Sequence, residues 1–397
     1  MTQIGGLRKT QGGCAAMRLT VGATRVRNLT VPHTSGRTVH IPDGYLSPET
    51  CVAACAVAAP FWYVAVRRVK TNVQSKAVPL LAVTSAFSFV VMMFNLPVPG
   101  GTTAHAVGMG IAAIVLGVWP AILAVSIALF IQALFFGDGG LTSFGANSLN
   151  MAVLGCLVAY GVYRLVAAKA PLDSPRRVLA AALGGYVGIN AAALLAAVEF
   201  GIQPLLFRDA TGAPLYAPYP LEVAVPAMAF AHLTIAGAAE AIVTGGIVAY
   251  LQRANPPLLL ATSGLAGRDE ATAPSWWSTR WLWAGLGGLM ILSPLGLVAA
   301  GIAWGEWGAG DFADPAVRDQ ISQASGNVAP PAQVPAGLEQ LSSIWTAPIP
   351  DYAPAFMHDE RFGYIVSAVI GSGLILLVVV AVSWIVGRFG RNAASAA

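Results

Sequence analysis

Long apolar stretches, separated by short polar segments, occupy most of the chain after its first 48 residues. Each stretch is long enough, or nearly so, to cross a hydrocarbon core about 30 Å thick as a helix. The stretches lie at residues 49–66, 79–96, 106–136, 146–166, 178–200, 223–251, 282–304 and 363–387. This pattern predicts an all-α integral membrane protein.

The stretch at 106–136 is too long for one ordinary span. It forms either a single overlong helix or two short spans broken at Trp119-Pro120, because proline breaks helices and disfavours the helical conformation in the residue before it. The positive-inside rule decides between them, because cytoplasmic loops collect Lys and Arg. The cation-rich segments 164–177 and 252–281 fall on the same side as the basic loop after the first span only if 106–136 is a hairpin.

The sequence therefore predicts a seven-span bundle followed by a two-span module. We expect the first module at 39–251, a cytoplasmic linker at 252–281, and the second module at 282–397. A large outer loop, 305–362, joins the last two spans, carries eight acidic residues and is rich in proline and alanine. A segment of that composition is expected to be loosely ordered.

Composition and charge narrow the class of protein further. The chain has 56% apolar and 10% charged residues, a mean hydropathy of +0.68 and a net charge of +4. Residues 1–38 contain six cations and no acid, so the remainder carries −2, and a nucleic-acid partner is excluded. No lysine follows a glycine, so the chain lacks a P-loop. ATP hydrolysis would have to come from another chain, and the protein is predicted not to be an enzyme.

Two histidines are predicted to meet at the outer face. His40 precedes the first span, and His105 ends a loop rich in proline and glycine after the second span. Imidazole nitrogen suits Ni, Co, Cu and Zn ions, so two converging histidines suggest a transition-metal site. The alternative is that each is a hydrogen-bonded structural residue.

Three motifs resemble the CbiM/NikM family, the substrate-binding components of energy-coupling-factor transporters for cobalt and nickel. They are His-Ile-Pro-Asp-Gly-Tyr-Leu-Ser-Pro at 40–48, Pro-Val-Pro-Gly-Gly-Thr-Thr-Ala-His at 97–105 and Phe-Gly-Ala-Asn-Ser-Leu-Asn-Met at 144–151. The second module, with Ser-Pro-Leu-Gly-Leu at 293–297, looks like the small NikN/CbiN companion subunit. The resemblance implies a plasma-membrane subunit that works with a transmembrane coupling (T) protein and ATPase (A) subunits. It also implies cobalt uptake for cobalamin biosynthesis or nickel uptake for nickel enzymes.

The resemblance also implies the metal ligands. Family members bind the ion through the terminal amine, the amide and imidazole of the second residue, and one loop histidine, which correspond here to Val39, His40 and His105. Four nitrogens in a plane suit Ni(II) and accept Co(II). Val39 provides an amine only if the working chain starts there. We therefore expect residues 1–38 to be an extension created by a misassigned start.

Further candidates are polar or small residues near the predicted site or inside the spans. Asp43, Asn147 and Asn150 are expected to support the ligand loops, or else to stabilise a turn or a helix end. His232 and Glu240 lie inside the seventh span and form either a functional site or a packing network. Ala54 and Ala58, four residues apart, form either a face for the coupling protein or packing within the bundle.

The function that this sequence favours is capture of Ni²⁺ or Co²⁺ for an ATP-driven importer. One alternative is an intramembrane metalloenzyme in which His40, His105 and His232 hold a catalytic metal. Another is a substrate-binding component for an organic vitamin, which requires a polar and aromatic pocket. The sequence does not choose between nickel and cobalt.

Overall fold

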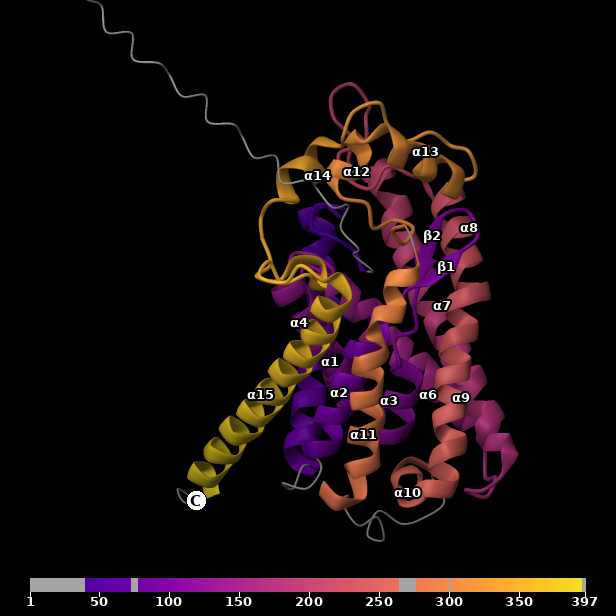
Figure 1. The fold of residues 1–397 in the computed structure, drawn as a ribbon, viewed down its shortest axis with the longest axis vertical. Helices are drawn as coiled ribbons and strands as arrows, with labels where there is room; N and C mark the ends of the chain where they lie inside the picture. Colours follow the sequence, from indigo (N-terminus) through magenta and orange to yellow (C-terminus); the bar gives the residue numbers. More distant parts are fainter. Residues whose placement is uncertain (1–39, 73–77, 264–275, 300, 395–397) are drawn as a thin grey trace, which may run out of the picture. The chain divides into compact units, whose positions relative to one another are not determined.

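The computed structural model describes residues 40–72, 78–263, 276–299 and 301–394, all within the unit Ser35–Ala397. Helices dominate, and the all-α membrane fold is confirmed (Figure 1). Seven helical segments among the described residues are long and apolar enough to cross a membrane. They are Pro48–Val69, Val118–Phe136, Phe144–Ala167, Pro175–Leu206, Leu221–Ala254, Arg280–Val298 and Glu360–Trp384.

The elements follow one another along the chain with short connections. Those before the linker are α1 (Pro48–Asn72), α2 (Val78–Met92), β1 (Leu96–Val98), β2 (Thr102–Ala104), α3 (Met109–Leu116), α4 (Val118–Ile131), η1 (Gln132–Phe136), α5 (Phe144–Asn147), η2 (Ser148–Gly155), α6 (Cys156–Ala167), α7 (Pro175–Leu206), α8 (Leu221–Ala231), η3 (His232–Ala236), α9 (Gly237–Ala254) and α10 (Pro257–Ser263). The later ones are α11 (Trp276–Leu292), η5 (Ser293–Val298), α12 (Ala309–Ala313), α13 (Pro315–Ala324), α14 (Ala336–Leu341), η6 (Pro350–Tyr352) and α15 (Glu360–Ala394). The elements η1, η2 and η3 are π-helical, and η5 and η6 are 3₁₀ turns.

The stretch 106–136 is broken into two helices, but the break lies at Gly117 and not at Trp119-Pro120. Gly117 has φ 80° and ψ 160°, a conformation essentially restricted to glycine. Pro120 is tolerated in the first turn of α4, where backbone N–H groups have no helical acceptor. The predicted third span is also shorter than expected, because the eight residues of α3 rise only about 12 Å. The preceding backbone, 105–108, is not helical.

Helix α7 forms the centre of the first module and packs against α6, α8 and α9. Its contact with α6 is close because Gly184 faces the Ala159 carbonyl oxygen, which a Cβ at that glycine would approach to 2.6 Å. Small residues let transmembrane helices approach closely and gain van der Waals contact. The long apolar helices thereby build a rigid support for the non-helical segments.

The loop 305–362 is not loosely ordered as its composition suggested. It contains α12, α13, α14 and η6, which lie at the same end of the helices as β1 and β2 (Figure 1). Trp304 and Trp307 pack with Phe200 and Tyr219 of the first module in one buried cluster. This aromatic burial supplies the stabilisation that the average composition of the loop did not indicate.

Candidate metal site

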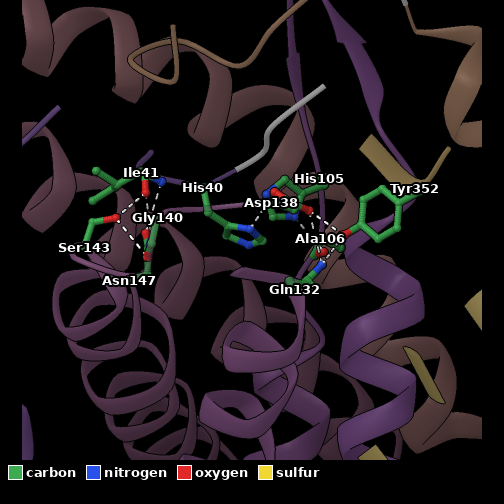
Figure 2. A network of polar contacts seen from close by, with 10 residues as sticks. All are labelled: His40, Ile41, His105, Ala106, Gln132, Asp138, Gly140, Ser143, Asn147 and Tyr352. Atoms are coloured by element: carbon green, nitrogen blue, oxygen red, sulfur yellow. Dashed lines mark hydrogen bonds and ion pairs between the residues drawn. The ribbon is translucent and has the colours of Figure 1, made fainter. Parts of the chain in front are cut away.

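The segment that carries His40 is fixed by the backbone of the next residue, Ile41. Its N–H donates to Asn147 Oδ1 at 3.1 Å. Its carbonyl oxygen accepts three hydrogen bonds, from Asn147 Nδ2 (3.1 Å), Gly140 N (2.9 Å) and Ser143 Oγ (2.5 Å). Figure 2 shows this cluster on one side of His40. Asn147 therefore supports the segment that carries the histidine.

Asp43 ties the same segment to the loop between η1 and α5. Its carboxylate accepts from the backbone N–H of Thr142 at 2.7 Å and of Leu141 at 3.2 Å. The loop approaches so closely that a Cβ on Gly139 would lie 2.9 Å from the His40 Cβ, and Gly139 has φ +84°. Asp43 thus stabilises the loop and does not contact an imidazole.

His105 is placed by β2 and by a carboxylate inside the bundle. The antiparallel pair β1–β2 ends at Ala104, and residues 105–108 then run without helical hydrogen bonds to α3. Glu240 of α9, fully buried, accepts from Val107 N (2.8 Å), Gly108 N (2.8 Å) and Gly110 N (3.0 Å). The side chain caps the N-terminus of α3, where a negative charge also opposes the helix dipole favourably. Of the two readings of Glu240, this is the structural one.

The structure brings the imidazoles of His40 and His105 together. Their ring centroids lie 5.2 Å apart, with the planes at 72°, and both residues are buried. His40 Nδ1 lies 3.0 Å from Asp138 Oδ1, and His40 Nε2 is buried without a hydrogen-bond partner. His105 Nδ1 donates to the Ala106 carbonyl oxygen at 3.1 Å. Because each Nδ1 faces an acceptor, each Nε2 is the nitrogen suited to bind a cation.

Asp138 belongs to a buried network that links the two modules. Its Oδ2 accepts from Tyr352 Oη at 2.5 Å and from Gln132 Nε2 at 3.3 Å, and Gln132 Nε2 also lies 2.8 Å from Tyr352 Oη. Figure 2 shows this group on the side of His40 opposite to Asn147. Tyr352 comes from η6, more than 200 residues after Asp138.

A small cavity of about 60 Å³ lies beside the two imidazoles. Its polar lining includes His40, Thr103, His105, Asn147, Asn150, His232 and Glu306. Burial, reinforced by the nearby Asp138 charge, raises the pKa of Glu306 well above its usual value. Trp304 also lines the cavity, so residues after the linker contribute to it directly.

His232 and Asn150 line this cavity from π-helical segments. His232 begins η3, and its Nδ1 donates to the Met228 carbonyl oxygen at 2.9 Å. Asn150 lies in η2, where its Nδ2 donates to Glu199 Oε2 at 2.7 Å. Single π-helical turns occur frequently at functional sites. Both side chains are thus close to the pocket but already engaged with neighbouring acceptors.

Two other predicted features have a different setting. Val39 lies outside the described residues. Ala54 and Ala58 are buried within the chain, as in the packing alternative, while Val52 and Val57 are exposed on the other side of α1. In the described part of the chain, no three His, Cys, Asp or Glu side chains are arranged to hold a metal ion. The site therefore offers two imidazoles, and any further donor has to come from elsewhere.

The residues that sequence reasoning missed are Asp138, Gln132, Tyr352 and Glu306. One signal was available for Asp138, which stands in Gly-Asp-Gly-Gly at 137–140, an acidic turn between apolar stretches. Glycines at a turn permit the close backbone approach seen here. The other three gave no local signal, because their neighbours in space are distant along the chain.

Comparisons with known proteins agree with this arrangement. A family described as the cobalt uptake substrate-specific transmembrane region matches residues 40–258, and the PDGLE domain matches residues 278–388. The chain is 60% identical over 338 residues to the fused nickel transport protein NikMN of Rhodobacter capsulatus, which covers 85% of this chain and 95% of that protein.

Two further relatives cover different shares of the chain. The probable fused nickel transport protein LarMN of Lactiplantibacillus plantarum is 40% identical over 343 residues, 86% of this chain and 96% of that protein. A crystal structure described as a transition metal transporter is 55% identical with a TM-score of 0.51, covering 54% of this chain and 93% of that one. The similarity therefore extends over both modules.

Replacing Glu240 with alanine is predicted to destabilise the loop that carries His105. The change leaves three buried N–H groups without an acceptor, and each such group costs about 1–3 kcal/mol. We expect a lower midpoint of thermal unfolding in detergent and faster hydrogen exchange at residues 107–110. Glu222→Ala, which removes an exposed acid from the first turn of α8, is the matched control. Unchanged exchange at 107–110 in Glu240→Ala would contradict the capping role.

Proposed function

The chain belongs to the family of the cobalt uptake substrate-specific transmembrane region, and on that premise we propose that it captures Ni²⁺ or Co²⁺ for an importer. The observation that carries the proposal is the pair of buried imidazoles, 5.2 Å apart, beside a small cavity. Imidazole nitrogen is a good ligand for both ions. The cavity of about 60 Å³ is far below the volume of roughly 300–1,000 Å³ that organic ligands occupy, which argues against a vitamin.

The proposed ligands are His40, His105 and the terminal amine of a chain that starts at Val39. With the rings as they stand, His40 binds through Nε2, because Nδ1 faces Asp138. The family arrangement also uses the amide nitrogen of the second residue. A chelate that includes the His40 amide has to close through Nδ1, so it would require this ring to leave Asp138.

We place the pocket on the outer side of the plasma membrane. Helix α1 begins close to His40 and runs toward Arg67 and Arg68, and cation-rich loops are cytoplasmic. The pocket is at the other end of that helix. An ion arriving from outside therefore reaches the histidines before it has crossed the membrane.

Release to the inside requires an energy source that this sequence lacks. No P-loop occurs in the 397 residues, so ATP hydrolysis is assigned to separate ATPase subunits, coupled through a transmembrane T protein. The two parts of the chain, 39–251 and 282–397, then act as the capture module and its fused companion, joined by the linker 252–281.

Substituting either histidine is predicted to abolish metal binding. Each of His40→Ala and His105→Ala removes one of the few nitrogen donors, and calorimetric titration of the full chain with NiCl₂ or CoCl₂ measures the loss. His358→Ala is the control, because His358 is exposed and does not line the cavity. Binding of wild-type strength in His105→Ala would overturn the proposed site.

The start of the working chain is predicted to lie at residue 39. Intact-mass spectrometry of the protein purified from its native membrane should give a mass without residues 1–38, and chemical labelling should find a free α-amine next to His40. A mass that includes those 38 residues would remove the amine from the ligand set while leaving the two imidazoles in place.

Metal accumulation is predicted to depend on a second, nucleotide-binding chain. Purification of the native complex should recover an ATPase that contains a P-loop. Substituting the P-loop lysine of that ATPase should stop uptake of radioactive nickel or cobalt by cells and leave binding to the isolated chain unchanged, because capture itself needs no nucleotide. Undiminished uptake in that variant would contradict the energy-coupling assignment.

A further inference from the structure

The side chain of Tyr352 reaches from η6 of the second module into the network beside His40. It is 1% exposed, and its ring stacks on Phe136 of η1 with centroids 4.8 Å apart. Its hydroxyl lies 2.5 Å from Asp138 Oδ2 and 2.8 Å from Gln132 Nε2. The tyrosine therefore contacts the first module through both its ring and its hydroxyl.

The donors and acceptors of this network follow from its chemistry. An amide nitrogen only donates, so Gln132 Nε2 donates to the Tyr352 oxygen, and the single hydroxyl proton is left for Asp138. The Asp138 carboxylate accepts at Oδ2 from Tyr352 and at Oδ1 from His40 Nδ1. His40 then carries its proton on Nδ1 and keeps the lone pair on Nε2. That tautomer is the one in which the imidazole can bind a cation from the cavity.

The backbone at Tyr352 is strained in a way that fixes the hydroxyl. Asp351 and Tyr352 have φ values of 56° and 58°, a region that residues other than glycine enter at a cost. The Tyr352 carbonyl oxygen accepts from Ser367 Oγ of α15 at 2.9 Å. Such strain persists only where the surrounding structure imposes it, and it is frequent at functional sites. Helix α15 and the stacked ring therefore hold the hydroxyl against Asp138.

We propose that Tyr352 is a positioning residue of the metal pocket, which acts through Asp138 on the tautomer and orientation of His40. The affinity of the first module for its ion then depends on correct docking of the second module. This inference rests on the proposed function, because it concerns the same pocket. Carboxylates that hold a ligand histidine typically change metal affinity 10- to 100-fold when they are removed.

A competing arrangement makes the opposite prediction for Asp138. If His40 binds the ion through Nδ1, in a chelate with its own amide, the carboxylate competes with the ion for that nitrogen. Asp138→Asn would then tighten binding. If Asp138 holds Nδ1 while Nε2 binds the ion, the same substitution weakens binding.

The test is calorimetric titration of the full chain with NiCl₂, together with the d–d absorption spectrum of bound Ni(II). Tyr352→Phe removes one oxygen atom and keeps the ring stacked on Phe136, so the fold is retained. We expect the affinity to fall about 10- to 100-fold and the Ni(II) bands to shift. Tyr364→Phe is the matched control. It removes another buried hydroxyl of the second module, which donates to the Met93 carbonyl oxygen at 3.0 Å, and it should keep the wild-type affinity and spectrum.

A double-mutant cycle separates action through Asp138 from a general loss of packing. In the Asp138→Asn background, Tyr352→Phe should add little, because the two side chains act as a unit. The inference is overturned by wild-type affinity and spectrum in Tyr352→Phe, by an equal loss in Tyr364→Phe, by a full additional loss in the Asp138→Asn background, or by tighter binding in Asp138→Asn. A wild-type chain that binds neither Ni²⁺ nor Co²⁺ would instead overturn the proposed function.

Discussion

The pocket depends on one constraint, that non-helical backbone buried between membrane helices must find all its hydrogen-bond partners inside the protein. The segment at His40 satisfies it through Asn147 and the η1–α5 loop, and the segment at His105 satisfies it through Glu240. An unpaired group in either segment would cost more than a typical surface substitution. The same hydrogen bonds that make these segments tolerable also hold the two imidazoles beside each other.

This constraint explains which parts of the fold could be predicted from the sequence. Apolar length and the distribution of Lys and Arg predict the helices, because both reflect the membrane directly. They do not predict a span that is half helix and half extended chain, as at residues 105–116. The break at Gly117 depends on a backbone conformation that glycine permits but does not require, and the adjacent proline was the stronger local signal.

The candidate site was predictable to the extent that its chemistry is local. His40 and His105 stand in short motifs whose order along the chain places them on one face. Asp138 touches His40 across 98 residues, and Tyr352 touches Asp138 across 214, so no window of sequence contains either pair. Composition also misjudged the loop 305–362. Its few aromatic residues pack together, and the cluster depends on which residues meet and not on their average.

The charge of the ion gives a physical reason for the second module to take part in the site. Two neutral imidazoles bring no negative charge, and a dication in a buried pocket is costly unless anionic groups lie close to it. Asp138 supplies one such group next to His40, and its carboxylate is held by Tyr352 from the second module. Glu306 of the same module lines the cavity. A companion that carries both the support for Asp138 and a second acid allows the pocket to remain dry and still hold a doubly charged ion, which histidines alone would do poorly.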